Sequence, residues 1–239
     1  GLTGADDVPA VVRVDLLDTW EATLPEGTPN RFLINIQPDE AAEVREFLGV
    51  KGIDAVLRPL VRARVVKIDG NSVSDLEFPS DRARRLADRE ANLSWSVELQ
   101  DDNRVVEGNW WDEGSEPGQV SVEQDFAEDL GIELGDELTF DVAGETLTAT
   151  VTSLRTVQWD SFQPNFFMMF SPGTLDVFPR THIGSLYADS SDGPTLLELI
   201  QRFPSVTVID IDAILGQVRR VMDQAAMAVH SSSRASPRP

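Results

Sequence analysis

The 239-residue sequence lacks cysteine, which excludes disulfides, thiolate metal sites and cysteine nucleophiles. Histidine is almost as scarce, because only His182 and His230 are present and His230 borders a polar tail. A histidine metal site or a Ser-His-Asp triad would therefore depend on His182 alone. The sequence contains neither a Gly-x-Ser-x-Gly elbow nor a glycine-rich phosphate-binding motif. We therefore expect no catalytic residues, and no ATP hydrolysis by this chain itself.

Long apolar runs are also missing. The longest unbroken run covers residues 166–170, whereas a membrane-spanning helix needs ~20 apolar residues. Acidic residues at 6–7 stand where a signal peptide would carry its positive and apolar regions. The sequence therefore predicts either a soluble protein or a domain cut away from membrane helices, with residues 230–239 as a disordered or vector-derived tail.

Positive charge is scarce, and the net charge of −21 is large. A surface this acidic repels phosphate backbones and anionic lipid headgroups, so we expect neither nucleic-acid binding nor peripheral membrane binding. Acidic pairs such as Asp125 and Asp129 are expected by chance among 41 acidic residues, and none has the spacing of a calcium loop. No metal or cofactor is expected.

Two segments show the same strand–helix–strand order. The first predicts a strand over 31–37, a helix from 38 to about 48 and a strand over 56–68. The second predicts a strand over 181–188, a helix starting at 192–194 and a strand over 206–211. Two such units can form a split β-α-β sheet with both helices on one face.

The residues between these units differ in character. Short strands are predicted over 93–99, 104–107, 119–122 and 165–170, with the segment 104–107 pairing with 93–99. A hairpin is predicted from 137–142 and 145–154 with its turn at 143–144, and one helix over 123–130. We therefore predict an α+β fold in which an α/β part, residues 10–70 plus 181–229, is interrupted by a β-rich insert, residues 71–180.

Both ends of the α/β part are predicted to be helical. Residues 10–20 place Val12, Leu16, Leu17 and Trp20 on one face. From Ala213 onward a second apolar stripe follows helical spacing: Ile214, Leu215, Val218, Val221, Met222, Ala225 and Val229. Either helix could continue into a longer one.

The aromatic residues of the insert are the candidate contacts for a partner or substrate: Trp110, Trp111, Trp159, Phe162 and Phe166. Tryptophan is favoured at interfaces, but of the two interpretations the sequence favours the one in which these residues form the core of the insert. Adjacent tryptophans in a strand cannot both point inward, so we expect Trp110 or Trp111 to be partly exposed.

Several long segments carry a family resemblance. The segments 92–95, 108–111 and 120–136 resemble FtsX-like ABC transporter permeases of the YbbP type, and the segments 159–167 and 203–210 are the most distinctive. The resemblance covers about residues 10–229. It implies an extracytoplasmic, MacB-like periplasmic core domain with a porter-like part and an inserted sabre-like part.

The resemblance also implies a function. Such permeases of the MacB-like, or type VII, superfamily carry this domain on the periplasmic side of the inner membrane, between flanking membrane helices. A separate ATPase chain drives its movement, and the substrate or partner is a periplasmic protein or a lipid. The alternative is a free-standing secreted protein that binds lipids or hydrophobic peptides. A hydrolase is disfavoured because His182 is the sole internal histidine.

Overall fold

The computed structural model describes the backbone of residues 24–234 and the side chains of residues 24–229. The helix predicted over residues 10–20 lies outside the described residues. Within them, helices and a strand-rich sheet are mixed, as an α+β fold requires.

Four strands form an antiparallel unit at one end of the sheet: β1 (Arg31–Ile36), β2 (Ala55–Ile68), β10 (Thr181–Leu186) and β11 (Thr207–Asp210). Their order is β11-β1-β10-β2, so each strand of one strand–helix–strand segment lies beside a strand of the other. This is the split β-α-β order predicted from the sequence. We call it the four-stranded unit.

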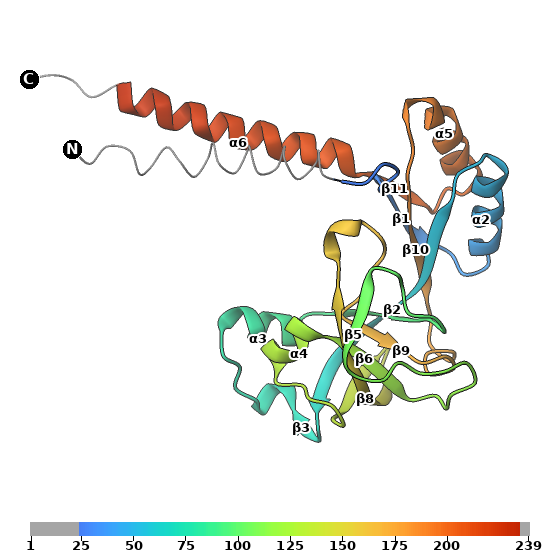
Figure 1. Ribbon diagram of the computed structural model, residues 1–239, viewed down its shortest axis with the longest axis vertical. Coiled ribbons are helices and arrows are strands. Elements are labelled where there is room, and N and C mark those ends of the chain that lie inside the picture. Colours follow the sequence, from blue (N-terminus) through green and yellow to red (C-terminus); the bar gives the residue numbers. More distant parts are fainter. Residues whose placement is uncertain (1–23, 235–239) are drawn as a thin grey trace, which may run out of the picture.

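The helices α2 (Ala41–Val50) and α5 (Gly193–Arg202) share one core with this unit. Val44 and Leu199 from the helices pack in the same cluster as Leu33, Leu57 and Leu186 from the strands. Figure 1 shows both helices on the same side of the unit. The helices therefore cover one face of the unit.

The long strand β2 leads out of the four-stranded unit into the remaining part of the sheet. That part, the strand-rich unit, contains β3 (Asn71–Ser72), β4 (Ala91–Trp95), β5 (Asn103–Gly108), β6 (Gln119–Glu123), β7 (Glu137–Val142), β8 (Glu145–Val157) and β9 (Met168–Phe170). A second core, built around residues such as Phe140 and Phe170, holds it together. Figure 1 shows the two units as separate bodies.

Two details of the strand-rich unit differ from the sequence-based expectation. The segment predicted to pair with residues 93–99 forms β5, and β5 pairs with β8, not with β4. A second helix, α3 (Asp81–Asp88), accompanies the predicted α4 (Gln124–Leu130). Only Ala83 and Ala87 of α3 are buried, so the helix carries almost no apolar period that a sequence pattern could reveal.

The hairpin between β7 and β8 forms as predicted. Val142 pairs with Glu145, which leaves Ala143 and Gly144 as a two-residue turn. Both turn residues have positive φ, 52° and 85°, as a type I′ turn requires.

The last helix, α6 (Ile211–Arg234), projects away from both units (Figure 1). It continues past residue 229, where the tail was predicted to begin, because extending an established helix costs little. Several residues of its apolar stripe are exposed, among them Ile214, Val218 and Val221. In residues 24–234, no helix combines the length and the apolarity that crossing a bilayer demands.

Candidate functional site

The structure buries two of the five aromatic residues singled out from the sequence. Trp111 and Phe166 join Leu60 and Met169 in a small core where the two units meet. The indole Nε1 of Trp111 donates to the Ser96 carbonyl oxygen at 2.8 Å. Both side chains therefore act as packing residues in this chain.

Trp110 is half-buried beside Trp111, with the ring centroids 3.9 Å apart. Its indole Nε1 donates to the Val97 carbonyl oxygen at 2.9 Å. One tryptophan of the pair is thus partly exposed, as expected. The reason differs from the expected one, because both residues follow the end of β5 and do not lie in a strand.

Trp159 and Phe162 lie in the loop that joins β8 to β9. Trp159 is 47% exposed, and its ring meets that of Phe167 edge-on at 5.2 Å. Phe162 is half-buried. Trp159 is therefore the most exposed of the five candidates, and their contact with a partner stays a prediction.

An aromatic groove of about 570 Å³ lies between α3, α4 and this loop. The rings of Phe126 and Phe167 stack in it at 4.7 Å, and the guanidinium of Arg89 lies 5.9 Å from the Phe167 centroid. The groove is also lined by Arg82 of α3, by Arg89 directly after α3, and by Asp125 and Asp129 of α4. The sequence pattern missed Arg82 and Arg89 because α3 itself was not predicted.

Arg155 fixes the backbone beside this groove. Its guanidinium is fully buried and donates to the carbonyl oxygens of Ser121, Phe166 and Phe167 and to Asn103 Oδ1. Burial lowers the pKa of Arg155 to about 10, an effect that the nearby carboxylates of Glu123 and Asp102 oppose. A buried cation that satisfies several carbonyl groups determines one conformation of the loop.

Asp102 anchors the same loop from the other side. It accepts hydrogen bonds from Ser161 Oγ and Asn165 Nδ2, both at 2.6 Å. Asn165 Oδ1 in turn accepts from Asn103 Nδ2 at 2.8 Å. The loop from 159 to 167 is therefore held at both ends by polar side chains.

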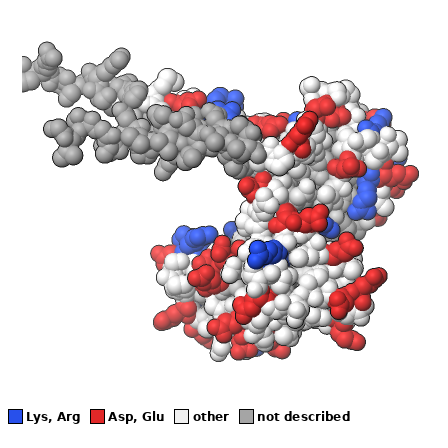
Figure 2. All heavy atoms as spheres, in the orientation of Figure 1, with Lys and Arg blue, Asp and Glu red and all other residues white. Residues whose placement is uncertain are grey.

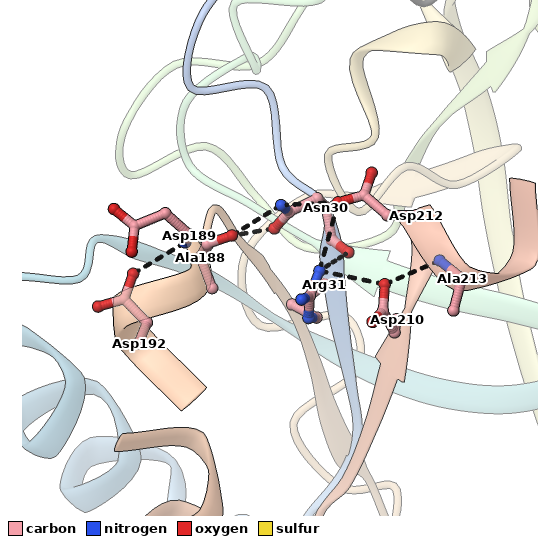
Figure 3. A network of polar contacts seen from close by, with 8 residues as sticks. All are labelled: Asn30, Arg31, Ala188, Asp189, Asp192, Asp210, Asp212 and Ala213. Carbon is pink, nitrogen blue, oxygen red and sulfur yellow. Dashed lines mark hydrogen bonds and ion pairs between the residues drawn. The ribbon is translucent and has the colours of Figure 1, made fainter. Parts of the chain in front are cut away.

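A second polar network lies where α6 leaves the four-stranded unit (Figure 3). Arg31 Nη1 lies 3.2 Å from Asp210 Oδ1 and 3.6 Å from Asp212 Oδ2. Asp210 Oδ1 also accepts from the backbone N–H of Ala213, which caps the first turn of the helix. We call these residues, together with Asn30, the helix junction.

Asn30 connects the helix junction to the neighbouring strand. Its Nδ2 donates to the Ala188 carbonyl oxygen and to Asp212 Oδ2, and its Oδ1 accepts from the Ala188 N–H. Its backbone carbonyl accepts from the N–H of Ile211 at 2.9 Å. The chain therefore enters β1 and leaves β11 at the same end of the same pair of strands.

In the part of the chain that the structure describes, no three acidic or histidine residues gather in a way that could hold a metal ion. His182 is half-buried, with its pKa lowered by desolvation first and by Arg180 and Arg45 second.

Comparison with known proteins gives a clear sequence relative. No protein-family model matches the chain. The chain is 39% identical over 209 residues to the uncharacterized ABC transporter permease YbbP of Escherichia coli (strain K12). The match covers 87% of this chain and 25% of that protein, so the chain spans about a quarter of its relative.

A solved structure also matches, a domain of a candidate permease protein from Porphyromonas gingivalis. It is 11% identical, and the match covers 77% of this chain and 83% of that domain with a TM-score of 0.35.

Proposed function

We propose that this chain is the extracytoplasmic domain of a YbbP-type ABC transporter permease, because it is similar in sequence to such a permease over most of its length. It lies on the periplasmic side of the inner membrane. The observation that carries the proposal is the 39% identity, which extends over 87% of the chain.

The proposed mechanism is mechanical and follows the type VII, MacB-like scheme. A separate ATPase chain closes on nucleotide and moves the membrane helices, and the domain transmits that movement to a periplasmic protein or lipid. The helix junction supports this mechanism, because α6 and the chain entering β1 meet at one end of the four-stranded unit. A rigid connection at that place would turn the whole unit with the helix.

The proposed division into parts follows the same scheme. Residues 10–70 with 181–229 form the porter-like part, and residues 71–180 form the sabre-like part. Two distinct hydrophobic cores support the division, one around Leu33 and Leu57 and the other around Phe140 and Phe170. The strand β2 contributes to both, so it would carry force from one part to the other.

The side of the membrane can be tested by labelling. The chain has no cysteine, so a single V177C substitution introduces one reactive thiol, at a side chain that is 79% exposed. In a full-length permease freed of other cysteines, a membrane-impermeant maleimide should label this position in cells with a permeabilised outer membrane. Labelling only after lysis of the inner membrane would refute the proposal.

The mechanical coupling needs a second measurement. Spin labels at V177C in the strand-rich unit and V50C at the end of α2 report the distance between the two units. In the permease with its ATPase, a non-hydrolysed ATP analogue should change that distance distribution, and R31Q should reduce the change. An unchanged distribution with bound nucleotide would argue against transmission through this domain.

A further inference from the structure

The aromatic groove carries charges of opposite sign on different walls. Arg82 and Arg89 line it at α3, whereas Asp125 and Asp129 line it at α4. Among the described residues, none of these four side chains forms an ion pair or a hydrogen bond. The two walls therefore do not neutralise each other, and both remain open to a ligand.

Helix stability does not account for these charges. Arg82 lies in the first turn of α3 and Asp129 in the last turn of α4, the ends where the helix dipole disfavours their charges. Asp125 and Asp129 are four residues apart on α4, and such a pair of like charges destabilises a helix by about 0.2–0.5 kcal/mol. The same spacing separates Arg85 from Arg89. A ligand that meets both walls would remove this cost.

A buried carboxylate adds an acceptor to the groove. Glu123 lines the groove, although only 4% of its surface is exposed. Its Oε2 accepts from the backbone N–H of Phe126 at 2.7 Å, which caps α4. Its Oε1 has no donor among the described residues, and it is not one of the unbonded atoms that the fold seals from the surface. This oxygen therefore faces the groove and can accept a hydrogen bond there.

The floor between the two walls is aromatic. Phe126 of α4 stacks on Phe167, and the guanidinium of Arg89 lies on the other side, 5.9 Å from the Phe167 centroid. Trp159 meets Phe167 edge-on and is 47% exposed. Ring faces of this kind accept apolar groups and cations. An apolar group on this floor would thus lie between the carboxylates and the arginines.

We propose that the aromatic groove binds a short peptide of two or three residues that has both termini free and an apolar side chain. The α-ammonium group donates to Glu123 Oε1, and the terminal carboxylate lies beside Arg82 and Arg89. The apolar side chain packs against Trp159 and the stacked rings. Two or three extended residues span about 7–11 Å, and a volume of about 570 Å³ holds a ligand of that size.

Charge complementarity favours a ligand of both signs. A simple cation would face the arginines, and a simple anion would face the carboxylates, so either would leave one wall without a partner. Figure 2 shows basic side chains gathered at the edge of the strand-rich unit where Figure 1 places α3, with acidic side chains directly beside them. This inference rests on the groove alone and does not depend on the assignment to a transporter.

A phospholipid with a zwitterionic headgroup also carries both charges, but its apolar part is in a different place. The acyl chains lie beyond the phosphate, whereas the side chains of a peptide lie between its two termini. In the groove, the rings lie between Arg89 and α4. The arrangement therefore matches a peptide.

The test titrates the ¹⁵N-labelled 239-residue chain with the dipeptide leucyl-phenylalanine. We expect a shift of the Trp159 indole N–H signal, which W159F identifies by its loss. N-acetylation of the dipeptide removes the ammonium charge, and C-terminal amidation removes the carboxylate. Each modified dipeptide should bind about tenfold more weakly, the effect of one hydrogen bond to a charged group.

Variants of the arginine wall test the carboxylate end of the peptide. Arg82→Gln with Arg89→Gln should weaken binding of the dipeptide about tenfold and leave binding of its amide unchanged. Arg45→Gln with Arg104→Gln removes the same charge from exposed positions outside the groove, so binding of the dipeptide should stay the same. Thermal unfolding of each variant shows whether it folds.

Variants of the acidic wall test the other end. Asp125→Asn with Asp129→Asn should weaken binding of the dipeptide and leave binding of its N-acetyl form unchanged. Glu43→Gln with Glu46→Gln removes the same charge from the exposed side of α2 and should have no effect on either ligand.

Four results would overturn the proposal. The first is equal binding of the dipeptide and either modified form, and the second is equal weakening by the groove variants and their controls. The third is the absence of any shift at millimolar dipeptide. The fourth is tighter binding of a short-chain phosphatidylethanolamine below its micelle concentration, which would assign the groove to a lipid.

Discussion

Arg155 is the largest side chain that the described part of the fold buries completely. A buried guanidinium is tolerated only when its donors are used, and here they satisfy three backbone carbonyls and one amide oxygen. The groups that Arg155 satisfies connect β5, β6 and the start of β9. Its contribution therefore lies in fixing the loop that carries Trp159 and Phe167.

Replacing Arg155 should be costly. R155M leaves the carbonyl oxygens of Ser121, Phe166 and Phe167 without a donor, so we expect a loss of about 3 kcal/mol in the free energy of unfolding, measured in urea. R104M changes an exposed arginine of β5 and should cost less than about 0.5 kcal/mol. Equal losses in the two variants would mean that the buried donors contribute little.

His182 should make stability depend on pH. Its pKa is lowered in the folded state, so near and below the ordinary value the unfolded chain binds more protons than the folded chain. The free energy of unfolding should therefore fall as pH drops from about 6.5 toward the lowered pKa. H182Q should flatten the slope between pH 7 and 5, measured by urea unfolding across that range. An unchanged slope in H182Q would contradict this assignment.

At the scale of elements, the turn of the β7–β8 hairpin contains a residue whose type does not favour its backbone conformation. Ala143 holds a φ of 52° in the turn, a conformation that asparagine adopts more readily than alanine. A143N should raise the free energy of unfolding by roughly 0.5 kcal/mol. G144A should lower the free energy of unfolding by roughly 1 kcal/mol, because the φ of 85° at residue 144 is strained for alanine. The cost comes from the backbone alone, since a Cβ at this position would meet open space. Thermal unfolding of both variants tests the turn type, and changes of the opposite sign would refute it.

The helix junction makes a different prediction. Arg31 bridges the two acidic residues at the start of α6, so R31Q should speed amide hydrogen exchange in the first turn of that helix several-fold. Global stability should change by less than about 1 kcal/mol, because Asp210 and Asp212 are partly exposed.

K51Q is a matched control for that variant. It removes the ion pair between Lys51 and Glu198, which joins α2 to α5 away from the junction. The rate of amide hydrogen exchange in α6 of K51Q should equal that of the parent chain. Two results would show that the helix junction does not hold the helix. One is faster amide exchange in α6 for K51Q, and the other is unchanged amide exchange in α6 for R31Q.

At the scale of the whole molecule, the net charge of −21 works against the compact state. Added salt screens this repulsion, since the Debye length falls from about 30 Å at 0.01 M to about 3 Å at 1 M. The Tm should therefore rise by several degrees between 0.01 M and 0.5 M sodium chloride. A Tm that stays constant or falls would mean that local ion pairs outweigh the overall repulsion.

Much of the fold followed from local pattern. The two strand–helix–strand segments, the hairpin at 143–144 and α4 are each coded by alternation, turn residues or helical period over short stretches. The helix α3 was missed because its apolar surface is two alanines, and the pairing of β5 was wrong because strand partners are not encoded in the strand itself.

The candidate sites were harder to predict. The aromatic residues were found by type, but burial separates Trp111 and Phe166 from the exposed Trp159, and burial depends on the packing of distant segments. Arg155 and Arg31 gave no sequence signal, because an arginine looks the same in a sequence whether its side chain faces water or a buried oxygen.

The sequence by itself determined the absence of thiol chemistry, the acidic surface and the order of the local elements, since each depends on residue type or on neighbours along the chain. Only the tertiary structure decided which loop Arg155 holds, that Trp111 and Phe166 are buried together, and that Arg31 meets Asp210. Those contacts join residues far apart in the chain, and only folding brings them together.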